Sequence, residues 1–230
     1  ATDFNNAQEG VQLLAQLPGV GVQYARIAFN SDLICAKTYQ DALQSGEIAA
    51  AFRSIALPAN YVTVQGIACT SMSFILGREC LARAALPGVP MITMWEAVCA
   101  ALRKLKAASV GVITPYIAEV HAKNVELLNE EGFRVARSMH FDCQTDAETD
   151  RVDPEYIADC AVRLAADGDL DTIFLGCSAM RVCTPDYISA LEARLSLPVV
   201  TSTQAFYWHA LRTGNIANTL KGYGVLFSES

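Results

Sequence analysis

Two cysteines in this chain each end an apolar run and are placed to do chemistry together. The stretch "VTVQGIACTSMSF" carries Cys69 at the end of a β-branched run, and "TIFLGCSAM" carries Cys177 in the same way. A free thiol has a pKa of about 8.5, so little of it is thiolate at neutral pH. The N–H groups at a helix N-terminus lower that pKa and also bind carboxylates. Each stretch therefore predicts a reactive sulfur beside an anion site.

An internal repeat relates the two cysteines. They are 108 residues apart (177 − 69), and "LPGVPMITMWEAVCAALRKL" aligns with "LSLPVVTSTQAFYWHALRTG" at the same offset. The pairs that share this offset are Pro90 with Pro198, Thr93 with Thr201 and Ala97 with Ala205. Two similar halves that face each other would bring both thiols to one cleft. The hydroxyl groups of Thr70, Ser71 and Ser178 would add hydrogen-bond donors there.

The other cysteines do not form a pattern that predicts a site. There is no CxxC, no CxxH and no histidine–cysteine pair at zinc spacing, so the sequence predicts no metal site. The length and the ample apolar content argue against a secreted disulfide scaffold. Five cysteines are expected to be inert core residues, namely Cys35, Cys80, Cys99, Cys143 and Cys160. Cys183 follows Cys177 so closely that its role stays open, with an inert thiol favoured.

The composition is that of an ordinary globular protein. With 52% hydrophobic and 18% charged residues, a chain of 230 residues can bury a substantial core. The net charge of −7 argues against a nucleic acid or an anionic membrane as partner. The apolar runs are too short to span a bilayer, and no signal-peptide pattern opens the chain. A cytoplasmic location is therefore expected.

Short apolar runs alternate with amphipathic segments, which is typical of an α/β protein with parallel sheets. Strands are expected at 21–29, 61–69, 90–93, 110–114, 133–141, 172–177 and 198–202. Helices are expected at 6–17, 39–56, 74–86, 96–107, 117–131, 154–166, 185–195 and 205–213. Thr114-Pro115 and Asp153-Pro154 each place a capping side chain before a proline, which predicts two helix starts.

The repeat also predicts two domains. The second half opens with the strand "ASVGVITPY", whereas no strand precedes "ATDFNN" in the first half, so a first strand is expected to be missing from the chain as given. The first domain would hold residues 1–93 with 205–230, and the second residues 94–204. In parallel sheets ligands bind beyond the carboxyl ends of strands, where Cys69, Cys177, Tyr116 and residues 1–4 are expected.

Taken together, these motifs resemble the aspartate/glutamate racemase superfamily. The branch is that of arylmalonate decarboxylase, maleate cis-trans isomerase and the related ectoine-utilisation proteins. The resemblance covers nearly the whole chain and rests on "ACTSMSF", "ITPYIAEV", "LGCSAM", "LPVVTSTQAFYWHALR" and the tail "GYGVLFSES". It implies two α/β domains related by a pseudo-twofold axis, an active site between them and no cofactor.

Motif matching also implies roles for single residues. Cys69 and Cys177 take the positions of the paired catalytic cysteines. The positions that hold the substrate carboxylate are taken by Thr70, Ser71, Tyr116 and Ser178. Asp3 lies where maleate isomerases carry a "PSSN"-like segment, and its acid would repel a second substrate carboxylate unless it were protonated.

Departures from the family pattern bear on the reaction. The decarboxylase has glycine at the position of Cys69, so two cysteines favour isomerisation or racemisation over simple decarboxylation. Amino-acid racemases continue the second cysteine as GCTH, whereas Cys177 precedes Ser-Ala-Met. The expected function is a cofactor-independent isomerase of a small carboxylate or dicarboxylate, resembling maleate cis-trans isomerase. The alternatives are a racemase of an amino acid or derivative, an arylmalonate decarboxylase-like enzyme, and a two-lobed small-molecule binding protein. The sequence leaves a homo-oligomer open.

Overall fold

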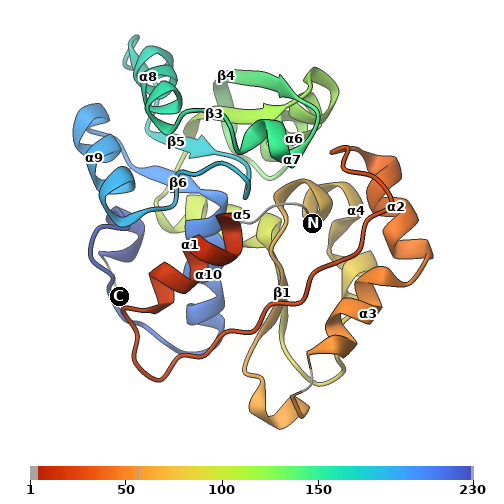
Figure 1. Cartoon of the computed structure of the whole chain (residues 1–230). Helices are drawn as coiled ribbons and strands as arrows, with labels where there is room; N and C mark the ends of the chain where they lie inside the picture. Colours follow the sequence, from red (N-terminus) through yellow and green to blue (C-terminus); the bar gives the residue numbers. More distant parts are fainter. Residues whose placement is uncertain (1–4, 56, 229–230) are drawn as a thin grey trace.

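A computed structural model describes residues 5–55 and 57–228, which form two parallel sheets flanked by helices (Figure 1). The first half runs α1 (Asn5–Leu14), α2 (Ala36–Gln44), α3 (Glu47–Ser54), η1 (Ala59–Tyr61), β1 (Gln65–Ile67), α4 (Thr70–Ala82) and β2 (Met91–Thr93). The second half runs α5 (Met94–Lys104), β3 (Ser109–Tyr116), α6 (Ala118–Glu130), β4 (Arg134–Cys143), α7 (Asp146–Thr149), α8 (Pro154–Ala165), β5 (Thr172–Leu175), α9 (Pro185–Leu195) and β6 (Val199–Thr201). The chain then continues into α10 (Ser202–Thr213) and η2 (Val225–Phe227).

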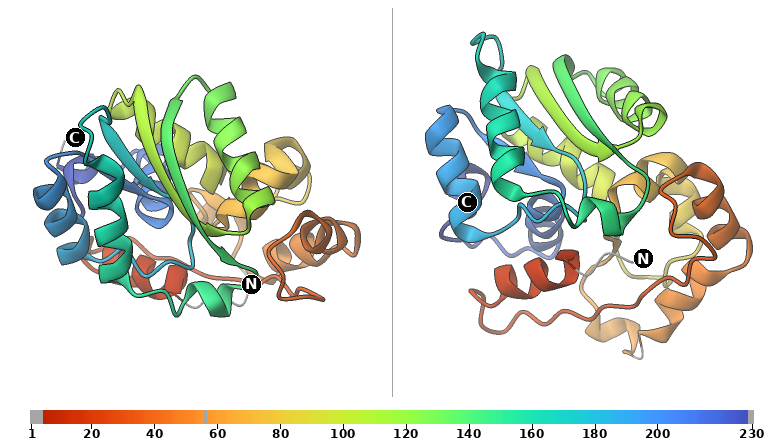
Figure 2. Two further views of the ribbon diagram at one scale, coloured as in Figure 1. Left: turned by 90° about the horizontal axis from the view of Figure 1, so that it is seen from above. Right: turned by 45° about the horizontal axis from the view of Figure 1, so that its top comes forward.

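The larger sheet has the strand order β4-β3-β5-β6, and all its strands are parallel. Its strands β3, β5 and β6 are almost wholly buried, as expected for parallel strands that are covered on both faces. Seen from above, α6 and α8 lie on opposite sides of this sheet (Figure 2). This arrangement confirms the predicted α/β class with parallel sheets.

The repeat is visible in the strand registers. In the smaller sheet Gln65, Gly66 and Ile67 pair with Met91, Ile92 and Thr93. Adding 108 to every number gives the β5–β6 register, Ile173–Val199, Phe174–Val200 and Leu175–Thr201. The helices that follow, α5 and α10, both begin with a capping box and pack against each other near the middle of the molecule (Figure 1). Where the chain divides into domains stays a prediction.

One strand prediction is wrong. Residues 21–29 are extended but belong to neither sheet, and most of their side chains are exposed or only half-buried. Alternating apolar residues indicate a strand only where a neighbouring strand can pair with the backbone. The segment expected at 61–69 is also shorter than predicted, because only β1 pairs there, with β2.

Two helix predictions also need correction. The helix expected at 39–56 is divided into α2 and α3 at Gly46, whose φ of 80° is left-handed and ends a helix. Thr114-Pro115 lies inside β3 and caps no helix, since α6 starts only after Ile117. The other proline signal is confirmed, because the Asp153 side chain accepts the Glu155 N–H at the start of α8. No described helix has the length and apolar character needed to cross a bilayer.

Candidate active site

Cys69 lies between β1 and α4, at the N-cap position of the helix. The helix expected from residue 74 begins at Thr70, so the first free N–H groups of α4 follow Cys69 directly. The Ser73 hydroxyl donates to the Cys69 carbonyl at 2.6 Å, which fixes the backbone of this turn. The Cys69 Sγ is 3.8 Å from the Ser71 Oγ. The thiol is half-buried and has a hydroxyl neighbour.

Cys177 has a different local structure. It follows β5 after Gly176, whose N–H donates to the Ile113 carbonyl, and it is buried. The next residues form a buried loop, and α9 starts only at Pro185, so no helix N-terminus follows this thiol. The Cys177 Sγ instead accepts the N–H of Ala179 at 3.4 Å. The loop between Cys177 and α9 agrees with the helix expected from residue 185, whereas the helix after Cys69 begins four residues earlier than expected.

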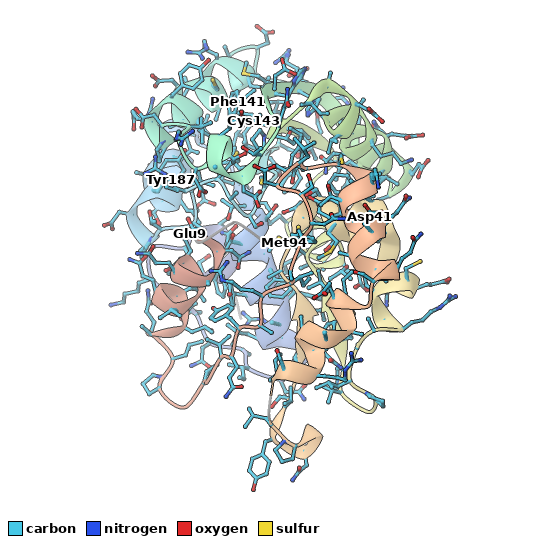
Figure 3. The ribbon with its side chains drawn as sticks, turned by 45° about the vertical axis from the view of Figure 1, so that its right-hand side comes forward. Glu9, Asp41, Met94, Phe141, Cys143 and Tyr187 are labelled. Atoms are coloured by element: carbon cyan, nitrogen blue, oxygen red, sulfur yellow. The ribbon has the colours of Figure 1, made fainter. Side chains whose placement is uncertain are left out.

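The loop after Cys177 is supported from the first half. Glu9 on α1, labelled in Figure 3, is buried, and its Oε1 accepts the N–H of Cys183 at 3.0 Å. Burial raises the pKa of the Cys183 thiol well above its usual value, and the Glu9 carboxylate raises it further. Cys183 is therefore a neutral, structural thiol.

Two buried tyrosines have both cysteines among their electrostatic neighbours. Tyr39 comes from α2 and Tyr116 from the end of β3. Burial raises the pKa of the Tyr39 hydroxyl well above 10.0, and Cys69 and Cys177 both raise it further. Burial also raises the pKa of Tyr116 well above 10.0, with Cys177 and then Cys69 adding to the shift. Each hydroxyl is thus close enough to both sulfurs to interact electrostatically with them.

The two tyrosines hold different contacts. The Tyr39 hydroxyl is 2.6 Å from the Ser71 Oγ. Tyr116 is fully buried, and its ring packs edge-on against Phe74 of α4 with centroids 6.1 Å apart. Its hydroxyl is buried beside the Cys177 thiol, whose charge and hydrogen bond add to the raised pKa of Tyr116.

The remaining predicted carboxylate ligands are only partly brought together. Thr70 is buried, and its hydroxyl donates to the Sδ of Met94 at 3.0 Å. Its backbone N–H lies in the first turn of α4, where an N–H has no acceptor within the helix. Met94 lies near the middle of the molecule (Figure 3). Ser178 is buried next to Cys177. Asp3 lies outside the described residues.

The sequence did not predict Tyr39 as a site residue, because no counterpart 108 residues later marks it: position 147 is alanine. Asp146, which also raises the pKa of Tyr39, was missed as well. A single antiparallel bridge between Leu33 and Thr145 brings the starts of α2 and α7 together. Tyr39 and Asp146 come together through this contact between distant segments, for which the sequence carries no local signal.

The other thiols divide by burial. Burial raises the pKa of Cys99 to about 12, and it also raises that of Cys143, in keeping with inert core residues. Cys35 differs: burial acts to raise its pKa, but hydrogen bonds from Thr38 and the charge of Lys37 together lower it. No described group of three or more histidine, cysteine or acidic side chains is arranged to hold a metal ion.

Comparison with known protein families identifies the family of this chain. The family model described as arylmalonate decarboxylase matches residues 22–227. The chain belongs to the arylmalonate decarboxylase family. An arylmalonate decarboxylase from Bordetella bronchiseptica is 34% identical over 168 residues, covering 70% of this chain and 69% of the relative. A maleate isomerase from Pseudomonas putida is 25% identical over 139 residues, covering 60% and 55%.

Solved structures of this family share the fold. A liganded arylmalonate decarboxylase, in which one glycine is replaced by cysteine and one cysteine by serine, has a TM-score of 0.81 at 27% identity and covers 100% of this chain and 96% of its own. A cysteine-to-serine variant of maleate cis-trans isomerase from Nocardia farcinica matches with a TM-score of 0.81 at 18% identity, covering 100% and 96%. That isomerase carries a covalently bound succinylcysteine intermediate. The named relatives are enzymes of small carboxylates, which confirms the predicted superfamily branch and an enzyme in place of a binding protein.

Proposed function

We propose that this protein is a cofactor-independent isomerase of a small carboxylate or dicarboxylate, in the manner of maleate cis-trans isomerase, with Cys69 and Cys177 as the catalytic residues. One observation carries the proposal. Thiols from the two halves of the chain lie near the same two buried tyrosine hydroxyls. A single substrate bound at those hydroxyls would therefore meet both sulfurs.

The surroundings suit a carboxylate. Because the pKa of both tyrosines is raised, their hydroxyls stay protonated at neutral pH and can donate hydrogen bonds. The first N–H groups of α4, the Ser71 hydroxyl and the Ser178 hydroxyl add donors on either side. Such donors stabilise negative charge best in a site without bulk water. They would hold the substrate carboxylate and the charge that builds up on it during reaction.

The reaction follows from that charge. The Cys69 thiolate attacks one alkene carbon of the cis substrate, forming a carbon–sulfur bond as the π electrons move into the adjacent carboxylate. The resulting enediolate has a single bond where the double bond was, so rotation becomes possible. Return of the electron pair expels the thiolate and leaves the trans alkene. Cys177 donates a proton to the enediolate carbon and takes it back before expulsion. The succinylcysteine seen in the Nocardia isomerase corresponds to such a protonated adduct.

Two other reactions use the same site. Because the 34% identical relative is a decarboxylase, loss of CO₂ from a malonate through an enediolate is the second candidate. A thiol on each face of a Cα–H centre would instead support a racemase. The cysteine at position 69 favours isomerisation or racemisation, since the family resemblance implies glycine at this position in the decarboxylase.

A substrate panel followed by NMR in D₂O tests the proposal. The panel contains maleate, arylmalonates, and free and N-acylated amino acids. Isomerisation gives fumarate from maleate. Racemisation exchanges the α-hydrogen for deuterium with loss of optical purity, and decarboxylation releases CO₂ with one deuterium incorporated. Conversion of an arylmalonate alone would assign the chain to decarboxylation and reject the isomerase proposal.

The cysteine variants test the residue roles. We expect Cys69→Ser and Cys177→Ser each to reduce turnover by at least about a hundredfold, because a serine hydroxyl is far less acidic than a thiol. Cys80→Ser is the matched control, since Cys80 is a half-buried thiol on α4. Wild-type activity in both variants would exclude a two-cysteine mechanism.

A further inference from the structure

The N-terminal end of α1 carries polar side chains on a face that is buried. The buried residues of that face follow helical spacing and include Asn6, Glu9, Leu13 and Leu14. Leucine is expected there, whereas an amide or a carboxylate loses its hydration on burial and needs hydrogen-bond partners. Asn6 and Glu9 are three residues apart, so their side chains are neighbours on the helix surface. The atoms to which they bond indicate the role of this end of the helix.

The two side chains bond to the segments that carry the two thiols. The Asn6 Nδ2 donates to the carbonyl of Ala68, the residue before the first thiol, at 3.1 Å. The Glu9 Oε1 accepts the N–H of Cys183, at the far end of the loop that follows the second thiol, at 3.0 Å. The first contact stays within the first half of the chain, and the second crosses to the other half. One turn of α1 therefore contacts both thiol-bearing segments.

The loop after the second thiol depends on contacts of this kind. Residues 177–183 form neither a helix nor a strand, so no regular backbone ladder fixes their path. Within the loop the Ala179 N–H donates to the Cys177 Sγ at 3.4 Å. The bond to Glu9 holds the end of this loop. The path of the loop, and with it the position of the Cys177 sulfur, is therefore set in part from α1.

Helix α1 is itself held against the core. It lies beside α10, which packs in turn against α5 (Figure 1). A Cβ at Gly10 would come 2.0 Å from the Tyr207 Oη, so the two helices approach closely at this glycine. Leu13 and Leu14 bury the following turn. Because a packed helix moves as a unit, a displacement that begins at one of its polar contacts also reaches the other.

We propose that α1 is a clamp that sets the position of the loop 177–183 relative to the Cys69 turn, with Asn6 and Glu9 as its positioning residues. Both side chains act here through backbone groups of the segments that they hold. The effect on turnover rests on the proposed function. A substrate that reacts with one thiol and exchanges a proton with the other needs both sulfurs in fixed positions, and a shift of about 1 Å can cost about a hundredfold in rate.

Hydrogen exchange at a reporter amide tests the clamp without any substrate. The reporter is the Ala179 N–H, because its bond to the Cys177 Sγ depends on the path of the loop. We expect Glu9→Met, which removes the acceptor and keeps a side chain of similar size, to speed this exchange by about tenfold or more. Asn6→Ala removes the contact in the other half, and we expect it to speed exchange at the same amide, because α1 links the two contacts.

Two variants are matched controls. Glu9→Gln keeps an oxygen that can accept the same N–H, so it should restore slow exchange. Gln16→Met removes the two bonds that this side chain makes with the backbone of Lys221, just beyond the other end of α1, and should leave the Ala179 amide unchanged. Thermal unfolding is measured for every variant. If Asn6→Ala does not fold, Asn6→Asp takes its place, since it has a similar size and no amide donor.

Two exchange results would overturn the clamp. An unchanged Ala179 amide in the Asn6 variant would show that the two contacts act separately. Equal acceleration in Gln16→Met would show a general loosening of α1 and no specific role for its polar face.

Turnover is measured separately on the same proteins. Loss of either contact should lower kcat by about tenfold or more and change KM less. The double variant of Asn6 and Glu9 should be no slower than the more impaired single variant, because a clamp fails once one end is released. Losses that multiply, or an unchanged kcat in both single variants, would reject the positioning role. Faster Ala179 exchange in a protein whose parent converts no carboxylate would count against the proposed function and leave the clamp supported.

Discussion

Replacing Tyr39 by phenylalanine removes one hydroxyl from the centre of the site and leaves the ring. The Tyr39 hydroxyl is 2.6 Å from the Ser71 Oγ, which in turn is 3.8 Å from the Cys69 sulfur. Loss of one donor at an oxyanion site costs about 10²–10³-fold in turnover. Since Tyr39 acts partly through Ser71, we expect kcat/KM to fall by about 10- to 100-fold, or about 1.4–2.8 kcal/mol.

The pH dependence and a control variant separate chemistry from folding. Because the pKa of Tyr39 is raised well above 10.0, its hydroxyl stays neutral, and the ratio of variant to parent activity should not vary between about pH 6 and about pH 9. Tyr187→Phe is the control, since the hydroxyl of Tyr187 on α9, labelled in Figure 3, donates to the Pro154 carbonyl of α8 at 2.9 Å.

Both variants lose one hydrogen bond of about 1 kcal/mol, so each should lower Tm by about 2–4 °C. Initial rates over a range of substrate concentrations and thermal unfolding measure the two effects. Activity of Tyr39→Phe within twofold of the parent would refute the reasoning. An equal loss in Tyr187→Phe would show that stability, not the site, is being measured.

Three further substitutions test the fold. Gly10→Ala places a Cβ against the Tyr207 ring, so we expect a loss of about 1–3 kcal/mol in chemical denaturation. Burial, and then His140, lower the pKa of His121 to about 4, so the unfolded chain takes up a proton near pH 6.5 that the folded chain takes up only near pH 4. Stability should therefore fall as the pH drops through that range, and His121→Gln should flatten this part of the unfolding curve. Glu192→Ala removes a carboxylate that accepts backbone N–H groups of β6 and η2, and hydrogen exchange should accelerate in both segments while activity persists.

Much of the fold could be predicted from local patterns. The boundaries of α9 are those expected, β2 begins one residue later than expected, and β6 is one residue shorter at each end. These elements have strong local signals: a proline at the start of α9, and a helix-capping threonine at the end of each strand. Residues 21–29 form a short apolar run that does not become a strand, because strand formation depends on a partner backbone.

The candidate site divides in the same way. The sequence alone predicted that Cys69 and Cys177 lie at strand ends 108 residues apart, because a repeat in the sequence reflects a repeat in the structure. The sequence predicted the start of the helix after Cys177 correctly, but it placed the helix after Cys69 at residue 74, whereas α4 begins at Thr70. The sequence also could not indicate Tyr39 as a site residue, because its hydroxyl contacts Ser71, which is 32 residues away along the chain.

By itself the sequence determined the α/β class, the repeat and the two thiols, because these follow from periodicity and from residue identity. Only the tertiary structure decided which hydroxyls neighbour both sulfurs, and that β1 pairs with β2 while residues 21–29 stay outside both sheets. Electrostatic neighbours and strand pairing are set by distances between segments far apart in the chain. Such distances exist only once the two halves have packed together.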